Sequence, residues 1–181
     1  RERELPPLAK RAVMECLNCF KTNEDNVLIA STGNISKLRI AYGITAIGER
    51  TFEDGNLLTE VSLPETVKSI GNSAFSGCKW LEEVKGAKRV EQIGERAFSC
   101  CGVLKRVELS EYLQKIGVRT FEHCTSLEEI LLPEGIEEIP EKAFYRCHTL
   151  RRVQFPSTLK RIGKEAFAFC RELREIQLPA K

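Results

Sequence analysis

Apolar residues recur along this chain at a fixed interval of 23 residues. The interval is clearest for six phenylalanines and for the isoleucine that lies five positions before each of them. The phenylalanines are Phe52, Phe75, Phe98, Phe121, Phe144 and Phe167. The isoleucines are Ile47, Ile70, Ile93, Ile116, Ile139 and Ile162. Such a period predicts a stack of equivalent turns, or rungs, because one turn cannot bury its apolar side alone and its neighbours must cover it.

Each repeat contains a segment that is typical of a strand. The pattern Leu127-x-x-Ile130-x-Leu132 has the alternating inward residues of a half-buried strand. A proline such as Pro133 follows and predicts the end of the strand, because proline cannot donate to a continuing ladder. The glycine after each isoleucine, such as Gly94, is expected to permit a tight bend. The residues that follow it, 95–98 in this repeat, are predicted to form a short helical turn.

The repeats over residues 35–181 resemble the BspA-type leucine-rich repeats of bacterial and protist proteins. The resemblance implies an α/β repeat solenoid, a right-handed leucine-rich-repeat superhelix with a parallel concave β-sheet and short helical turns on the convex side. It also implies a surface-exposed or secreted protein that binds host proteins, matrix or other cells. The chain departs from many other leucine-rich repeats because no asparagine follows the strand. One repeat also has Gly86-Ala87 in place of Leu-Pro, so a looser strand end is expected there.

Residues 1–34 do not follow the repeat and are predicted to form an N-terminal cap of a helix plus a β-hairpin. Pro6-Pro7 can begin a helix. The apolar residues that then share one helical face are Ala9, Val13, Cys16, Leu17 and Phe20. Residues 26–30 are typical of a strand and 31–34 of a turn. A cap is expected because the end of a solenoid exposes its core. The array over 35–181 shows no C-terminal cap, so we expect it to be open or truncated there.

Eight cysteines allow more than one interpretation. Five of them follow the phenylalanines by three positions, namely Cys78, Cys101, Cys124, Cys147 and Cys170. We expect free thiols packed inward, since small free cysteines are among the most often buried residues. Disulfides between rungs remain an alternative, although parallel inward side chains fit disulfide geometry poorly. Cys16-x-x-Cys19 is a single pair without a second one at matching spacing, so a metal or redox role is a weaker alternative.

Composition and charge argue against several classes of function. The net charge is +2 over 181 residues, too small for a general nucleic-acid or membrane binder. No apolar run reaches the length that crosses a bilayer. The chain has two histidines, His123 and His148, and it lacks a glycine-rich phosphate loop and a G-x-S-x-G motif. We therefore expect no enzyme activity, no cofactor, no metal, no nucleic-acid partner and no membrane insertion in this fragment.

Outward-facing rows can be read from the sequence because equivalent residues of adjacent rungs lie about 5 Å apart in a parallel stack. The row before the inward Val or Ile is Glu60, Glu83, Arg106, Glu129, Arg152 and Glu175. Its alternating signs favour a ladder of exposed ion pairs, each worth under about 1 kcal/mol. They also argue against a phosphate-binding stripe. The next outward row contains Leu131 and Gln154. Mixed rows on a concave sheet are the usual binding surface of a solenoid.

A third row, which precedes the repeated leucine, begins with Leu57, Trp80 and Val103. An exposed apolar cluster with an aromatic residue often marks an interface. The alternative is that loops or the N-terminal segment cover it. Tyr145 and Phe169 form a smaller candidate patch near the other end. Two further blocks of opposite charge, with Glu137 and Glu138 in one and Lys160 and Arg161 in the next repeat, are expected to be solvated surface. The alternative is that they attract each other or a partner.

These features predict a non-catalytic module that binds a protein or glycan, with adhesion or host and surface recognition as its role. The candidate partner-binding residues are Glu83, Arg106, Glu129, Leu131, Arg152, Gln154, Leu57, Trp80 and Val103. The alternative is an intracellular protein-interaction scaffold. Cysteines without evident pairing favour that alternative, since they suit a reducing compartment.

Overall fold

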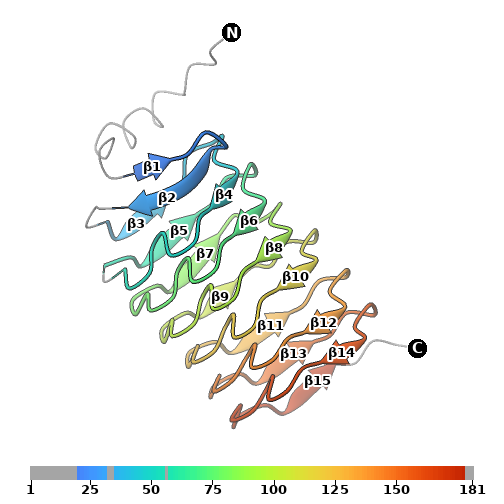
Figure 1. The fold of residues 1–181 in the computed structure, drawn as a ribbon. Coiled ribbons are helices and arrows are strands. Elements are labelled where there is room, and N and C mark those ends of the chain that lie inside the picture. The colour runs from blue at the N-terminus through green and yellow to red at the C-terminus, as the bar shows by residue number, and fades with distance from the viewer. Residues whose placement is uncertain (1–19, 32–34, 56, 178–181) are drawn as a thin grey trace.

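The chain is a stack of short rungs. A computed structural model describes residues 20–31, 35–55 and 57–177, and these residues form fifteen β-strands and no helix. Successive rungs follow one axis, with β1 near one end and β15 at the other (Figure 1). The architecture is a parallel β-solenoid of about six turns, as the repeat period predicted.

The strands form two columns. The long-strand column contains β3 (Lys37–Arg39), β5 (Glu60–Ser62), β7 (Glu83–Lys85), β9 (Arg106–Val107), β11 (Glu129–Leu131), β13 (Arg152–Gln154) and β15 (Glu175–Gln177). The isoleucine column contains β1 (Phe20–Thr22), β2 (Val27–Ser31), β4 (Ala46–Ile47), β6 (Ser69–Ile70), β8 (Gln92–Ile93), β10 (Lys115–Ile116), β12 (Glu138–Ile139) and β14 (Arg161–Ile162). The sequence predicted the first column, whereas β4 and the later strands of the second column are two residues long and a periodicity argument does not detect them.

Equivalent residues pair in register within each column, except between β9 and β11 and between β10 and β12, where the sheets are interrupted. In the long-strand column Val61 is opposite Val84, and Val84 is opposite Val107. In the isoleucine column Ile47 is opposite Ile70, which in turn is opposite Ile93. All these pairs are parallel, because each strand meets the same segment of the next repeat after one complete turn. The buried branched side chains therefore stack directly on one another.

A proline interrupts the isoleucine column. On other rungs the amide after the isoleucine donates to the preceding rung, as Gly71 does to the Ile47 carbonyl at 2.8 Å and Gly94 to the Ile70 carbonyl at 2.8 Å. Pro140 occupies the equivalent position after β12 and has no N–H to donate. The sheet is divided between β10 and β12, at the rung where this bond cannot form.

The segment predicted as a helical turn is instead a stack of β-turns, so the prediction of short helices on the convex side was wrong. We call residues 49–55, 72–78, 95–101, 118–124, 141–147 and 164–170 the turn stack. In one rung Arg96 and Cys100 have φ angles of +52° and +61°, which a right-handed helix cannot contain. The Phe98 amide donates to the Thr120 carbonyl of the next rung at 2.9 Å, while the Ser99 amide closes a turn to the Arg96 carbonyl at 3.1 Å. Amides thus alternate between partners within the turn and in the neighbouring rung.

The glycine directly before most segments of the turn stack, such as Gly94, was expected to permit a tight bend, but it has a different role. Gly94 does not have a positive φ angle. A Cβ atom at this position would lie 2.6 Å from the Asn72 amide nitrogen and 2.7 Å from the Gly71 carbonyl carbon. Glycine is therefore required because the backbone of the preceding rung comes too close for any side chain.

Six phenylalanine rings form the centre of the core. Rings of adjacent rungs are stacked with centroids 5.1 to 5.5 Å apart and planes within 10° of parallel. The four inner rings, Phe75, Phe98, Phe121 and Phe144, are completely buried. Offset stacking of this kind adds about 0.5–1.5 kcal/mol per pair to the burial of the rings.

The five periodic cysteines form a second ladder beside the rings, as predicted. Each thiol donates to the carbonyl of the phenylalanine 26 residues earlier, for example Cys124 Sγ to Phe98 O at 3.2 Å. The first four are buried and Cys170 is half-buried. All six cysteines of the described ranges are free thiols. Cys16 and Cys19 lie outside those ranges.

Thiol reactivity should therefore be uneven in the folded protein. Burial raises the pKa of Cys78 to about 12 and lifts the pKa of Cys124 well above its usual value, whereas Cys100 is exposed. Because the thiolate is the reactive form, iodoacetamide at mildly alkaline pH should modify Cys100 well before Cys78 or Cys124. Peptide mass spectrometry measures the order. After unfolding without reductant, all eight cysteines should be alkylated. Equal native labelling of Cys124 and Cys100 would contradict the buried ladder.

At the N-terminal end, β2 (Val27–Ser31) matches the strand that was predicted at residues 26–30, shifted by one residue. It pairs antiparallel with β1 and parallel with β4. These two strands extend the isoleucine column beyond β4. Phe20, which was predicted to lie on the helix after Pro6-Pro7, is instead the first residue of β1. The rest of that predicted helix and most of the predicted turn at 31–34 lie outside the described residues, so the complete cap remains a prediction.

Side chains connect the rung of β11 and β12 to the rung of β13 and β14. Each connection joins residues 23 positions apart. The pairs are Glu128 with Arg151, Glu129 with Arg152 at 3.5 Å, Glu137 with Lys160 at 3.0 Å and Glu138 with Arg161 at 2.9 Å. Glu137 and Glu138 of the acidic block thus pair with the basic block, although a solvated surface was the favoured interpretation of these charges.

Glu134 makes a further connection that should depend on pH. Its carboxylate accepts hydrogen bonds from the Ser157 hydroxyl at 2.6 Å and the Ser157 amide at 3.0 Å, and these bonds lower its pKa. A carboxyl whose pKa is lower in the folded state stabilises the fold above its unfolded pKa, and this stabilisation is lost as the pH falls through the folded value.

The Glu134→Gln variant should therefore melt below wild type at neutral pH. The difference in melting temperature should vanish as the pH falls through the lowered pKa that Glu134 has in the folded state. Glu65→Gln is the matched control, because Glu65 is the equivalent residue of a rung whose next neighbour is Lys88 rather than a serine. Circular-dichroism melts at several pH values provide the measurement. A difference that persists unchanged in acid would contradict the role of the ionised carboxylate.

Candidate functional site

The long-strand column presents most of the predicted partner-binding residues. Glu83, Arg106, Glu129 and Arg152 lie on the successive strands β7, β9, β11 and β13. They flank buried residues on alternating strand positions, so their side chains face outward. Leu131 on β11 is 49% exposed. Gln154 on β13 is also exposed.

The charges on this face are paired in one half and partly free in the other. Glu129 and Arg152 form the expected rung-to-rung pair. Nearer the N-terminus Lys85 lies between two carboxylates, at 3.2 Å from Glu60 and 3.3 Å from Glu83. Hydrogen bonds to Glu60 and Glu83 raise the pKa of Lys85. Arg106 therefore has no ion pair with a described residue, although it lies beside Glu83 in the sheet. The alternating ladder is formed only in part.

The Leu57–Trp80–Val103 row lies at the corner where the turn stack leads into the long-strand column. Trp80 is 58% exposed, Leu57 is 50% exposed and Val103 is half-buried. No described segment of the chain covers this row. Two of its three side chains thus present large apolar surfaces to solvent.

Later rungs show what the fold itself uses at this corner. Ser126, equivalent to Val103, donates its hydroxyl to the Gly102 carbonyl at 2.7 Å. Thr149, the next residue of the row, donates to the Thr125 carbonyl at 2.8 Å. These hydroxyls tie each rung to the preceding one. An apolar side chain cannot make this bond, so neither solenoid packing nor hydrogen bonding accounts for Trp80.

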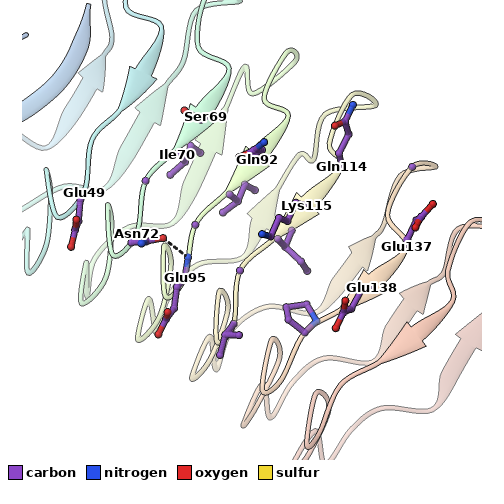
Figure 2. Close-up of a pocket in the computed structure, with 18 of the residues that line it drawn as sticks. Glu49, Ser69, Ile70, Asn72, Gln92, Glu95, Gln114, Lys115, Glu137 and Glu138 are labelled. Carbon is purple, nitrogen blue, oxygen red and sulfur yellow. Dashed lines mark hydrogen bonds between the residues drawn. The ribbon is translucent and has the colours of Figure 1, made fainter. Parts of the chain in front are cut away.

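A groove runs along the outer side of the isoleucine column (Figure 2). It has a volume of about 1190 Å³ and extends over several rungs. Glycine Cα atoms line part of it because those positions hold no side chain. Ser69, Gln92 and Lys115 contribute polar groups from β6, β8 and β10, and Asn72 Oδ1 accepts a hydrogen bond from the Glu95 amide at 2.9 Å. This groove was not predicted, although the repeated Ile-Gly pair in the sequence was a signal for it.

The described ranges contain no group of three His, Cys, Asp or Glu side chains that could hold a metal ion. His123 and His148, which neighbour the cysteine ladder, are half-buried. His123 meets the Tyr145 ring edge-on, with centroids 6.0 Å apart. No helix in residues 20–31, 35–55 or 57–177 is long and apolar enough to cross a bilayer.

Solved structures with the same architecture come from several bacteria. A leucine rich cell surface protein from Faecalibacterium prausnitzii has a TM-score of 0.73 and 27% identity, over 87% of this chain and 52% of that one. A leucine-rich repeat protein from Bacteroides ovatus has a TM-score of 0.69 and 27% identity, over 88% of this chain and 51% of that one. The chain thus spans about half the length of these two proteins.

A leucine rich repeat protein of T. pallidum has a TM-score of 0.66 over 95% of this chain and 91% of that one, and at 21% identity it shows the fold alone. No curated protein gives a significant match. The family described as BspA type leucine rich repeat region, in six copies, matches residues 20–105 and 91–181. The chain therefore belongs to the BspA-type leucine-rich repeat family.

Proposed function

We propose that this chain is a non-catalytic module that binds a protein partner at the cell surface, through the long-strand column and the Leu57–Trp80–Val103 row. Proteins of this repeat family are generally protein-interaction modules. The Faecalibacterium prausnitzii protein with the same fold is described as a cell surface protein, which supports that location for this chain.

The exposed Trp80 carries the proposal. Tryptophan is among the residues that most often dominate binding energy when a partner covers them. Here it is 58% exposed, whereas two later rungs use the hydroxyls of Ser126 and Thr149 at this corner to join the rungs. The side chain thus gives up a stabilising contact and leaves apolar surface in water. Contact with a partner would bury that surface.

Charges near this row suit a protein partner better than a nucleic acid. Lys105 and Arg106 are exposed on the rung of Val103, and neither forms an ion pair with a described residue. Carboxylates of Glu82 and Glu83 occupy the preceding rung. Mixed signs around an apolar centre are typical of a protein interface, whereas phosphates require an uninterrupted positive stripe.

The experiment compares single variants on a panel of immobilised extracellular proteins, measured by biolayer interferometry. Trp80→Ser should weaken a bound partner about thirtyfold, since a tryptophan hot spot contributes about 2 kcal/mol or more. Serine is the residue that the fold accepts at the equivalent position 126. Tyr42→Ser is the matched control, because Tyr42 is an exposed aromatic residue on a different turn. Equal losses in both variants, or no loss in Trp80→Ser, would count against this surface.

The location is tested separately by treating intact source cells with protease. Released peptides of this chain are expected for a surface protein. Complete protection in intact cells, with digestion only after lysis, would favour the intracellular scaffold. The observation that favours this second candidate is the set of six free cysteines in the described ranges.

A further inference from the structure

The turn stack offers an internal comparison, because the fold imposes the same backbone on every rung. One position of the turn stack has a positive φ angle in every rung, between 55° and 72°. The residues at this position are Asp54, Gly77, Cys100, His123, Arg146 and Phe169. Glycine, aspartate, asparagine and histidine tolerate this conformation, but it is unusual for a bulky side chain. Phe169 is therefore the least suited residue of the series.

Burial does not compensate for this strain, because Phe169 is 54% exposed. The equivalent positions near the N-terminus hold smaller residues. In the neighbouring row Tyr145 follows Glu53, Ser76, Ser99 and Glu122, none of which is aromatic. Two aromatic residues thus occur together at positions where the fold accepts small ones. Strained residues with exposed side chains are candidates for a functional role.

The two rings and a guanidinium group form one cluster. Tyr145 and Phe169 meet edge to face, with centroids 5.4 Å apart. The Arg146 guanidinium lies 5.4 Å from each of these rings. The His123 ring meets the Tyr145 ring edge-on, with centroids 6.0 Å apart. We call His123, Tyr145, Arg146 and Phe169 the aromatic–arginine cluster.

The charge of the cluster is positive and only partly balanced. Lys142 Nζ lies 5.2 Å from the Tyr145 centroid, and its charge is paired with Glu165 at 3.3 Å. Arg146 is exposed and forms no ion pair with any carboxylate of the described chain. A guanidinium beside aromatic rings keeps its N–H groups available for a carboxylate, which it can bind through two parallel hydrogen bonds.

We propose that the aromatic–arginine cluster is a second docking site, for an acidic segment of a protein partner in which an apolar side chain lies next to a carboxylate. The carboxylate would pair with Arg146, and the apolar side chain would cover the Phe169 ring. The site lies on the turn stack and shares no residue with the surface of the proposed function, so the two stand or fall separately.

A peptide of alternating glutamate and leucine is a suitable probe, with the corresponding glutamine and leucine peptide as its neutral control. Binding is followed by amide chemical shifts of the whole chain, which detect weak complexes and locate them. The acidic peptide should shift residues 123, 145, 146 and 169 and their neighbours. The neutral peptide should bind at least about tenfold more weakly, and added salt should weaken only the acidic one.

Three replacements test the individual residues. Phe169→Gly, Tyr145→Ser and Arg146→Gln should each lower the affinity for the acidic peptide at least about tenfold. An earlier rung has Gly77 at the position equivalent to Phe169 and Ser76 at the position equivalent to Tyr145. Phe169→Gly should therefore melt within about 2 °C of wild type, or above it, because glycine adopts the positive φ angle without strain. Trp80→Ser should bind the peptide normally.

Loss of binding without loss of stability would establish a docking role for Phe169. The proposal is overturned if the acidic peptide does not bind, if it binds elsewhere, or if Phe169→Gly binds it as wild type does. If the neutral peptide binds as tightly as the acidic one, Arg146 does not recognise a carboxylate and the proposal is wrong. A hyaluronan oligosaccharide supplies carboxylates without a peptide. If it shifts the cluster residues while the acidic peptide does not, the site recognises an anionic glycan and the protein-segment proposal is wrong.

Discussion

The Phe98→Ala variant is expected to lose about 4 kcal/mol of unfolding free energy, the largest effect of any single replacement considered for this protein. Phe98 is completely buried and is stacked between Phe75 at 5.3 Å and Phe121 at 5.5 Å. Removing the ring opens a cavity between two rungs whose spacing is fixed by backbone hydrogen bonds on both sides. The cavity therefore cannot collapse easily, and the melting temperature should fall by about 10 °C.

Phe167→Ala is the matched control, because the same replacement is made at the end of the ring stack. Phe167 stacks on Phe144 at 5.2 Å and meets Phe155 edge-on, but it is only half-buried. Its loss should be about half as large, since solvent already reaches one side. Urea titration followed by circular dichroism measures both variants. Equal losses, or a smaller loss for Phe98→Ala, would contradict the continuous ring stack as the centre of the core.

The Gly94→Ala variant should show the second largest effect, a loss of about 3 kcal/mol and about 8 °C in melting temperature. The added Cβ would lie 2.6 Å from the Asn72 nitrogen and 2.7 Å from the Gly71 carbonyl carbon. Both are backbone atoms held by the hydrogen bonds of the isoleucine column, so the two rungs must separate to admit a methyl group.

Gly102→Ala is the control for the effect that the same replacement has on the conformational entropy of the unfolded chain. The nearest atom to its added Cβ is Thr125 Oγ1 at 3.6 Å, an ordinary contact. This variant should remain within about 1 kcal/mol of wild type, or be slightly more stable, because alanine lowers the entropy of the unfolded chain. Thermal melts of both proteins provide the comparison. A Gly94→Ala protein as stable as Gly102→Ala would show that the rungs are not held at this close spacing.

Sequence periodicity predicted the stack, the register and most of the core. A spacing of 23 residues that no insertion interrupts allows only a structure in which every rung meets an equivalent one. Phe98, Cys101 and Leu104 are consequently buried where the pattern places them. The outward row of the long-strand column followed from the same argument, because strand alternation determines which residues face solvent.

Other features depend on how adjacent rungs approach each other. Short helical turns were expected over residues 95–98, yet Arg96 adopts a positive φ angle and alternate amides of this segment bond to the next rung. Ion pairing on the outward row likewise depended on the length of the side chains. The long side chain of Lys85 connects Glu60 and Glu83, and this leaves Arg106 without a partner in the described chain.

The sequence alone thus determined the repeat, the parallel pairing and the identity of the buried ladders, since these follow from which residues must avoid water. The tertiary structure decided the conformation of the turn stack, the close backbone contact at Gly94 and the meeting of Tyr145, Arg146 and Phe169. The physical reason is distance. Hydrophobic periodicity specifies the face on which a residue lies, whereas backbone hydrogen bonds between rungs set the separations that determine which conformations and contacts are possible.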